Sequence, residues 1–275
     1  PLFTNMVYAG EISGALDETL EEMAEYFEKQ QKTRQKVKSA LSYPIVVGII
    51  AILVVIFLLI SIVPTFVSMF AQFGGDLPAI TKFVMSASDW MTSYWYIFIL
   101  IVLALVFSVL LIRQKKETKY YLDYFLLKLP IFGKLMRKSL LARMTRTLSS
   151  LLNNSVPVLQ AMDLTIKIVE NEVIARVLKE SRDALERGSS MAGPMEKHWA
   201  FPPLISQMIA VGEQTGSLDQ MLGRVADFYE SEVDTATDQL KLLIEPLMII
   251  FLAGIVGIIV MSIMVPMFEI FNNVN

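Results

Sequence analysis

The chain has 275 residues, no cysteine and a formal net charge of −3. These values exclude disulfides, thiolate nucleophiles and cysteine-held metals, and they give no argument for a nucleic-acid partner. Apolar residues make up 54% of the chain and are concentrated in three blocks, which indicates a membrane protein.

The first 43 residues are predicted to be helical. Residues 1–9 end an amphipathic helix, Gly10–Gly14 form a turn, and a long amphipathic helix follows over Ala15–Lys38. One face of this helix is apolar, with Leu16, Leu20, Met23, Ala24 and Phe27. Basic residues gather in its second half, at Lys29, Lys32, Arg34, Lys36 and Lys38.

The first membrane crossing is predicted at Ile45–Val63, which carries no charge. At about 1.5 Å per residue this stretch is about 28 Å long, enough for a hydrocarbon core of roughly 30 Å. Pro44 is expected to open the crossing and Pro64 to close it. The alternative is a buried core helix, but such helices seldom run this long without a polar face.

A short loop at 64–93 is expected to lead into a second crossing at Tyr94–Ile112. The aromatic run Tyr94-Trp95-Tyr96 is typical of a membrane interface. Basic residues follow this crossing, at Arg113, Lys115, Lys116 and Lys119.

The region 113–241 is helical by pattern. Its predicted helices include Asn171–Glu186, which stops at Gly188, and one from Ser217 to about Leu243, where Ser217 and Gln220 fit a capping box. The third crossing is predicted at Leu247–Val265, again without charge.

The predicted fold is therefore an all-α, polytopic membrane protein with three transmembrane helices and two duplicated cytoplasmic helical-bundle domains. Residues 1–43 would be the C-terminal part of the first domain and 113–243 the second domain. Residues 44–112 would hold two crossings, and 244–275 the third crossing with a short extracytoplasmic tail.

The distribution of Lys and Arg predicts the orientation. Five basic residues precede the first crossing and four follow the second, whereas Lys82 is the one basic residue in the loop between them. By the positive-inside rule the two helical domains lie in the cytoplasm. The loop 64–93 and the C-terminus then lie outside the cytoplasm.

An internal repeat supports this organisation. An offset of 202 residues aligns Gly10-Glu11-Ile12-Ser13-Gly14 with Gly212-Glu213-Gln214-Thr215-Gly216, and it also aligns Pro44 with Pro246 and Pro64 with Pro266. Because the second copy has about 70 residues before the point matching Pro1, the natural protein is expected to carry a comparable upstream stretch.

The repeated turn is the candidate site. The first glycine is expected to end one helix in a left-handed conformation, and the second to allow close approach at the next helix. The carboxylates of the two glutamates are expected to accept bonds from backbone N–H groups of the turn. A structural role is favoured over a partner contact. The candidate residues are Gly10, Glu11, Gly14, Leu16, Asp17, Gly212, Glu213, Gly216, Leu218 and Asp219.

Two further sets of residues mark the membrane boundaries. Pro44, Glu245 and Pro246 stand where the chain is expected to enter the membrane, and Pro64 and Pro266 where it leaves. Glu245 is expected to be an interfacial carboxylate, with a salt bridge to a neighbouring helix or subunit as the alternative.

Signatures of catalysis and of cofactor binding fail on inspection. The segment Gly188–Gly193 has the spacing of a phosphate loop, but Pro194-Met195 follow where Lys-Ser/Thr is required. His198 is the only histidine, so no histidine-based metal site or Ser-His triad is expected. The sequence predicts a protein without enzyme activity, cofactor or metal.

Short motifs follow one another in a fixed order along the chain: Arg143-Met144-Thr145-Arg146-Thr147-Leu148, Val156-Pro157-Val158, Gly188-Ser189-Ser190, Phe201-Pro202-Pro203, Val211-Gly212-Glu213-Gln214-Thr215-Gly216-Ser217-Leu218, Glu245-Pro246 and Val265-Pro266-Met267-Phe268. As an ordered set they resemble the inner-membrane platform proteins of type IV pilus and type II secretion machines. Ser155 departs from the family, which commonly has glycine there.

The resemblance implies a scaffold in the bacterial inner membrane. Its implied partners are a cytoplasmic hexameric assembly ATPase, pilin or pseudopilin subunits, other inner-membrane assembly proteins and further copies of itself. The ATPase would drive extraction of pilin-like subunits from the lipid bilayer.

Two other function classes remain as alternatives. A small membrane permease or channel component would need a polar lining at mid-membrane, which the three crossings lack. A membrane enzyme would need a nucleophile–base pair, and none is evident. Solute flux or hydrolysis by the purified protein alone would favour these classes over a scaffold.

Overall fold

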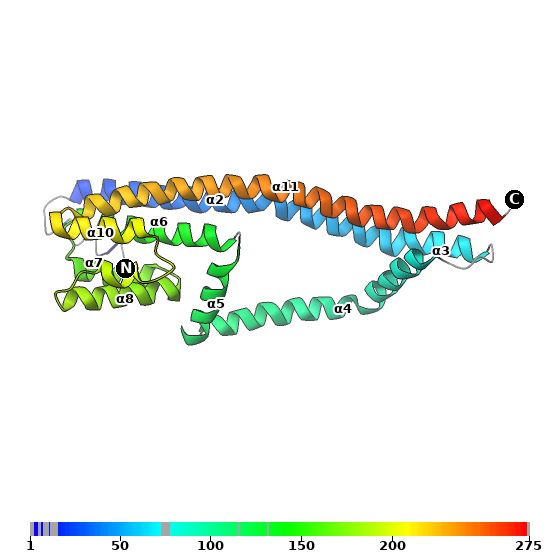
Figure 1. Ribbon diagram of the computed structural model, residues 1–275, viewed down its shortest axis with the longest axis horizontal. Coiled ribbons are helices and arrows are strands. Elements are labelled where there is room, and N and C mark those ends of the chain that lie inside the picture. Colours follow the sequence, from blue (N-terminus) through cyan, green and yellow to red (C-terminus); the bar gives the residue numbers. More distant parts are fainter. Residues whose placement is uncertain are drawn as a thin grey trace. The chain divides into compact units, whose positions relative to one another are not determined.

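The computed structural model describes residues 3, 4, 7, 11, 16–72, 78–114, 116–130 and 132–273. These residues form helices joined by short turns, with no strand among them, which confirms the predicted all-α class (Figure 1). The chain divides into two compact units. Unit 1 comprises Pro1–Lys38 and Leu111–Gln239, and unit 2 comprises Ser39–Leu110 and Leu240–Asn275.

Unit 1 is a bundle of helices around one apolar core. The helices that lie wholly within it are α5 (Lys116–Lys128), α6 (Phe132–Asn153), α7 (Val158–Ile168), α8 (Glu172–Glu186), α9 (Ala192–Glu196) and α10 (Pro203–Thr215). Two longer helices, α2 (Leu16–Phe57) and α11 (Leu218–Asn273), contribute residues to both units.

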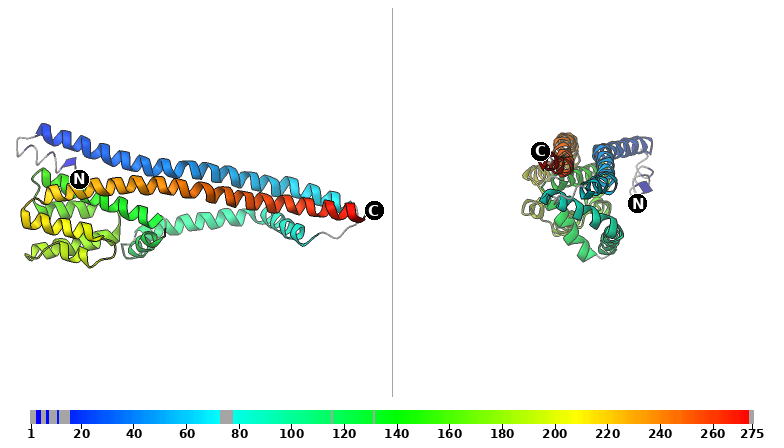
Figure 2. Two further views of the ribbon diagram at one scale, coloured as in Figure 1. Left: turned by 45° about the horizontal axis from the view of Figure 1, so that its top comes forward. Right: turned by 90° about the vertical axis from the view of Figure 1, so that its right-hand side faces the viewer.

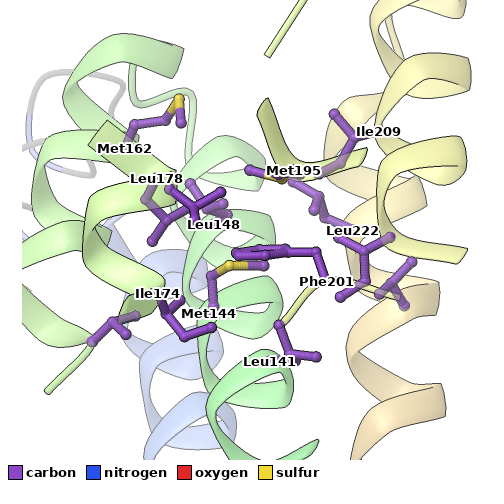
Figure 3. Close-up of a cluster of buried hydrophobic side chains, with 14 of the residues drawn as sticks. Leu141, Met144, Leu148, Met162, Ile174, Leu178, Met195, Phe201, Ile209 and Leu222 are labelled. Atoms are coloured by element: carbon purple, nitrogen blue, oxygen red, sulfur yellow. The ribbon is translucent and has the colours of Figure 1, made fainter. Parts of the chain in front are cut away.

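Helix α6 supplies the centre of the core of unit 1. Leu141, Met144, Leu148 and Leu151 recur at helical spacing and are essentially without solvent exposure. Figure 3 shows the first three among side chains from other helices, which include Ile174 and Leu178 of α8. Burial of each large aliphatic side chain stabilises the fold by about 1.5–3 kcal/mol, so this core accounts for the cohesion of unit 1.

Helix α8 shows how local sequence sets a helix boundary. The side chain of Asn171 accepts hydrogen bonds from the backbone N–H groups of Val173 and Ile174, both at 3.1 Å. An asparagine in this position satisfies donors that the first turn leaves free. The helix ends before Gly188, which has φ of 77°. The predicted helix at Asn171–Glu186 is thus confirmed, with Asn171 as its cap.

The predicted apolar face of α2 is only partly buried. Met23 and Tyr26 enter the core of unit 1, and the Tyr26 hydroxyl lies 3.0 Å from Thr147 Oγ1. Leu16, Leu20 and Phe27, expected on the same face, are 39–45% exposed. The core of unit 1 is therefore contacted at Met23 and Tyr26, and the remaining residues of the apolar face stay exposed in the described part of the chain.

The turn before α7 places a non-glycine residue in the left-handed region. Ser155 has φ of 58°, and Pro157 is the residue at the N-cap of α7. An L-residue other than glycine pays roughly 1–2 kcal/mol in this conformation. The departure from glycine noted at Ser155 therefore falls on a position where glycine is the residue that fits without strain.

Replacing Ser155 with glycine should stabilise unit 1. The relieved strain exceeds the extra chain entropy of glycine in the unfolded state, so we expect a gain of about 0.5–1 kcal/mol. The measurement is the denaturant midpoint of the purified chain followed by circular dichroism. Ser150→Gly, inside α6, is the control and should lower the midpoint. A lower midpoint for Ser155→Gly would contradict the strain argument.

Unit 2 contains the most apolar helices. Its elements are the C-terminal part of α2, the π-helical turn η1 (Leu58–Ile62), α3 (Val63–Gln72), most of α4 (Ala79–Gln114) and the C-terminal part of α11. Within this unit α11 runs beside α2 and α3 in each view (Figure 1, Figure 2). A small core of this unit is formed by Leu59 of η1, Val63 of α3, Val84 of α4 and Ile259 of α11.

Two segments among the described residues are long and apolar enough to cross a membrane, Ser42–Met69 and Leu218–Val265. Only 11% of the most apolar stretch of each is buried. A soluble core helix would be buried, so this exposure argues against that alternative for Ile45–Val63. The expected second crossing, Tyr94–Ile112, is not one of the two. This crossing stays a prediction. Tyr94, at its expected start, marks a kink inside α4, with φ of −122° and ψ of 15°.

The helices of unit 2 do not begin or end at the prolines as expected, whereas the membrane boundaries assigned to these prolines stay predictions. Pro44 lies inside α2 and does not open a helix. Pro64 does not close one, because the helical path continues through η1 and α3 to Gln72. The expected loop 64–93 is largely helical, although 73–77 lie outside the described residues. The expected tail after Pro266 continues α11 to Asn273.

Candidate functional site: the glycine turn and the loop it contacts

The repeated turn is described in its second copy, between α10 and α11. Helix α10 ends at Gly216, which adopts a left-handed conformation with φ of 73° and ψ of 13°. The N–H of Ser217 donates to the Gly212 carbonyl at 3.1 Å, which closes the end of α10. Helix α11 begins at Leu218, and Asp219 lies in its first turn, where a negative charge favours the helix dipole.

The two glycines have the reverse of their expected roles. Gly216, expected to give room for a close approach, supplies the left-handed conformation and has nothing within 4 Å of a would-be Cβ. Gly212, expected to be left-handed, lies inside α10. A Cβ there would stand 2.8 Å from Leu218 Cα. The reason is that the helix runs one turn past Gly212 before it ends.

The cap at the start of α11 also differs from expectation. The Ser217 hydroxyl lies 2.6 Å from the Thr215 hydroxyl. The capping-box contact between Ser217 and Gln220 is not formed in this described part of the chain. The start of α11 is held from α6 as well, because the Ser149 hydroxyl donates to the Asp219 carbonyl at 2.9 Å.

Glu213 joins the turn to a loop more than twenty residues earlier in the chain. One carboxylate oxygen accepts from the Met191 backbone N–H at 2.8 Å, and the other from the Ser190 hydroxyl. The Ser190 oxygen in turn accepts from the Ala192 N–H at 3.1 Å. The carboxylate therefore binds a backbone N–H, as expected of its chemistry, but one that belongs to the loop before α9 and not to its own turn.

The loop and the turn together line a surface hollow of about 530 Å³. Its lining residues are Val158, Leu185, Gly188, Ser189, Ser190, Met191, Gly212, Glu213, Gln214, Gly216 and Leu218. The lining is mainly apolar, with polar groups supplied by the two serines, Glu213 and Gln214. Such a mixed, partly open surface suits contact with a protein segment better than chemistry on a small substrate.

The Gly188-Ser189-Ser190 loop thus has a structural use that sequence reasoning missed. Its phosphate-loop spacing pointed to no function, and the sequence offered no sign that Ser190 would contact Glu213. A spacing of 23 residues between a loop and the last turn of a helix carries no periodic signal. Only the packing of α8, α9 and α10 brings the two residues together.

A second polar cluster, the Arg146 cluster, consists of Arg146, Asp227 and Glu230. Arg146 of α6 donates through Nε and Nη2 to the two Glu230 oxygens of α11, both at 2.8 Å, and also contacts Asp227. Burial acts to lower the pKa of Arg146, but the hydrogen bonds that Arg146 donates to Glu230 and Asp227 outweigh it and the pKa is raised. The guanidinium therefore stays charged and holds α6 to α11.

A cavity of about 330 Å³ lies beside the Arg146 cluster. Its lining residues are Tyr26, Gln30, Thr33, Arg34, Lys38, Ser139, Ala142, Arg143, Arg146 and Glu230. Sequence reasoning named Arg143 and Arg146 only as parts of a signature. The partners of Arg146 were not predicted, because carboxylates at i and i+3 of a helix look like an ordinary solvated face.

His198 lies in the link between α9 and α10. Its Nδ1 accepts from the Ala200 N–H at 3.2 Å, and burial lowers its pKa against an opposing influence of Glu180. Within the described residues no group of three or more His, Asp or Glu side chains is arranged to hold a metal ion. The ring therefore acts as a local hydrogen-bond acceptor in the link.

The first copy of the turn can be placed only in part. Gly10 and Gly14 lie outside the described residues, and Glu11, Leu16 and Asp17 are exposed. Of the boundary residues, Glu245 and Pro246 are exposed on α11 and Pro44 is half-buried on α2.

Comparison with known proteins gives a consistent result over most of the chain. Residues 1–64 and 144–266 match the family described as type II secretion system (T2SS), protein F. The chain is 39% identical over 275 residues to the type IV pilus assembly protein PilC of Thermus thermophilus. The aligned region covers 100% of this chain and 68% of the relative.

Two further relatives agree. The type IV pilus assembly protein PilC of Pseudomonas aeruginosa is 38% identical over 272 residues, 98% of this chain and 73% of its own length. A type II secretion system protein F of Aeromonas hydrophila is 36% identical over 276 residues, 100% of this chain and 71% of its own length. The similarity thus extends through both compact units.

Proposed function

Because the chain belongs to the type II secretion system protein F family, we propose that it is a non-enzymatic inner-membrane platform of a type IV pilus or type II secretion machine. The platform would couple a cytoplasmic hexameric assembly ATPase to the extraction and assembly of pilin-like subunits. The observation that carries this proposal is the similarity over the whole chain to proteins named for pilus assembly and for secretion.

The distribution of polar and apolar residues supports a membrane platform. Unit 1 has a buried apolar core and a charged surface, as a water-exposed bundle requires. Unit 2 exposes large apolar side chains along both candidate spans, as lipid-facing helices do. Together with the basic residues that flank the spans, these features support the proposal that unit 1 lies in the cytoplasm, where the ATPase would bind it.

The hollow beside Glu213 is the proposed contact surface for an assembly partner. Its two walls come from family motifs, Gly188-Ser189-Ser190 and Gly212–Leu218, and Glu213 holds them together through Met191 and Ser190. In the proposal, the Glu213 carboxylate fixes the shape of the hollow and takes part in no reaction. The energy for assembly would come from the ATPase.

The proposal predicts that the detergent-solubilised full chain captures the hexameric assembly ATPase of its own machine and hydrolyses no nucleotide alone. Gln214→Arg, on the hollow, should reduce capture at least tenfold. Gln207→Arg is the matched control, because this exposed glutamine lies on the same helix but outside the hollow. Capture can be measured by pull-down and hydrolysis by phosphate release.

Two results would count against the proposal. Nucleotide hydrolysis by the chain alone would make it an enzyme, and failure to capture the ATPase would remove the coupling role. If Gln207→Arg abolished capture while Gln214→Arg did not, the platform would stand but the hollow would not be the contact surface.

A further inference from the structure

Two prolines of unit 2 stand 202 residues apart and each leaves one helical carbonyl without its normal donor. Pro64 follows the π-helical turn η1 at the start of α3, and Pro266 lies inside α11. A proline has no backbone N–H, so the carbonyl one turn earlier loses its hydrogen bond. In a bilayer no water replaces that bond, so an unpaired carbonyl there is costly.

The carbonyl left open by Pro266 is that of Ser262, four residues earlier in α11. The hydroxyl of Thr81, on α4, donates to this carbonyl at 2.7 Å. Thr81 is only 2% exposed and Ser262 only 1%. A buried side chain from another helix therefore supplies the donor that the proline lacks.

The carbonyl left open by Pro64 is that of Leu59. In η1 the N–H of Val63 donates to the carbonyl of Leu58, five residues earlier. With the same spacing the donor for Leu59 would be residue 64, which is the proline. The hydroxyl of Ser88, also on α4, donates to the Leu59 carbonyl at 2.7 Å, and Ser88 is 2% exposed.

The two donors share one face of α4. Thr81 and Ser88 are seven residues apart, two helical turns, so their side chains lie on the same side about 10 Å apart. Val84 lies between them and belongs to the small core of unit 2. Phe83 and Trp90, on other faces, are 70% and 54% exposed. The buried edge of α4 thus consists of two hydroxyls and an apolar contact between them.

We propose that Thr81 and Ser88 are positioning residues that set the register of α4 against the two proline-containing helices. Each hydroxyl donates to a carbonyl that a proline has deprived of its backbone donor, so the bond satisfies an acceptor that the helix itself leaves open. A shift of α4 by one residue would remove both hydroxyls from their acceptors. This inference concerns the packing of unit 2 and does not rest on the proposed function.

The test is a pair of double-mutant cycles on the full chain in mixed micelles, read by reversible unfolding in SDS. Ser88→Ala should lower the folded-to-unfolded ratio about 3- to 15-fold. In a Pro64→Ala background, where residue 64 regains its N–H, Ser88→Ala should cost less than twofold. Thr81→Val should behave in the same way toward Pro266→Ala.

The matched controls isolate the donor role. Ser88→Ala should keep its full cost in a Pro266→Ala background, and Thr81→Val in a Pro64→Ala background. Ser86→Ala should be nearly neutral, because the Ser86 hydroxyl is exposed and bonds the Lys82 carbonyl of its own helix at 2.9 Å. Thr81→Ser and Ser88→Thr keep a hydroxyl and should stay within twofold of the parent.

The proposal is overturned if Ser88→Ala costs the same with and without Pro64, since the hydroxyl would then contribute packing alone. The conservative substitutions provide an independent test if the proline variants do not fold. Thr81→Val nearly preserves side-chain volume, so an effect no larger than that of Thr81→Ser would also overturn the donor role.

Discussion

Replacing Gly216 with valine should destabilise unit 1 by about 2–3 kcal/mol and abolish assembly of the machine. Gly216 ends α10 with φ of 73°, a conformation in which a β-branched side chain is strongly disfavoured. Nothing lies within 4 Å of a Cβ at this position, so the cost is one of backbone conformation and not of crowding. The measurement is the thermal midpoint of the purified chain, together with pilus or secretion output in cells.

The substituent decides the size of the effect at Gly216. Asparagine tolerates the left-handed region and should cost least, alanine more and valine most. Gly193→Ala is a matched control, because a Cβ at this glycine also meets nothing within 4 Å while its φ lies outside the left-handed range. Glu213→Gln keeps both glycines of the turn and should leave the chain folded. Normal stability and output for Gly216→Val would show that the turn does not need glycine.

Crowding should appear instead at Gly212. There an added Cβ would stand 2.8 Å from Leu218 Cα, a backbone atom that cannot rotate away. The start of α11 would have to move for α10 to accept alanine at this position. The two glycines of one motif are therefore needed for different physical reasons.

Truncating Arg146 to alanine should destabilise unit 1 by about 2–4 kcal/mol. The Arg146 side chain is only 16% exposed and forms a two-pronged contact with Glu230, whose side chain is 22% exposed. Removal of the guanidinium leaves that carboxylate half-buried without its partner and beside Asp227. The measurement is the urea midpoint of the purified chain followed by circular dichroism.

Two comparisons test whether the loss comes from the stranded carboxylate. Arg146→Met with Glu230→Gln should recover part of the stability lost by Arg146→Met, because no buried charge is then unpaired. Lys138→Ala is the control, since Lys138 and Glu232 form a more exposed ion pair between the same two helices, worth less than about 1 kcal/mol. If Arg146→Ala and Lys138→Ala lowered the stability of unit 1 equally, the more buried Arg146–Glu230 pair would contribute no more than the more exposed Lys138–Glu232 pair, and the argument would be contradicted.

The roles of Arg146 and Gly216 also bear on the family motifs. Both residues belong to short motifs. The sequence alone was enough to assign these motifs to a family, but it did not show their structural roles. The structure shows one motif clamping α6 to α11 and the other turning the chain from α10 into α11. Both tasks fix the start of the helix that continues into unit 2.

The periodicity of apolar residues was enough to predict the all-α class and the uncharged spans at Ile45–Val63 and Leu247–Val265. Local chemistry was enough for the helix that Asn171 caps and Gly188 ends. These features depend on neighbours within a turn or two along the chain, so single-sequence reasoning reaches them.

The prolines of unit 2 could not be interpreted from the sequence because their effect depends on distant donors. A proline inside a helix removes a hydrogen bond, so local reasoning predicts helix boundaries at Pro44, Pro64 and Pro266. The helices nevertheless continue, and at Pro64 and Pro266 hydroxyls of α4 bond the freed carbonyls. The donors are 29 and 181 residues away from the carbonyls, which no local pattern reveals.

By itself, the sequence determined the helical class, the apolar spans, the 202-residue repeat and the family. Each of these can be read from residue types at fixed positions along the chain, without knowledge of which segments pack together. Only the tertiary structure decided which glycine is left-handed, which N–H groups Glu213 binds, which carboxylates hold Arg146 and which hydroxyls support the proline-containing helices. Those contacts join segments far apart in the chain, and their geometry exists only once the helices have packed.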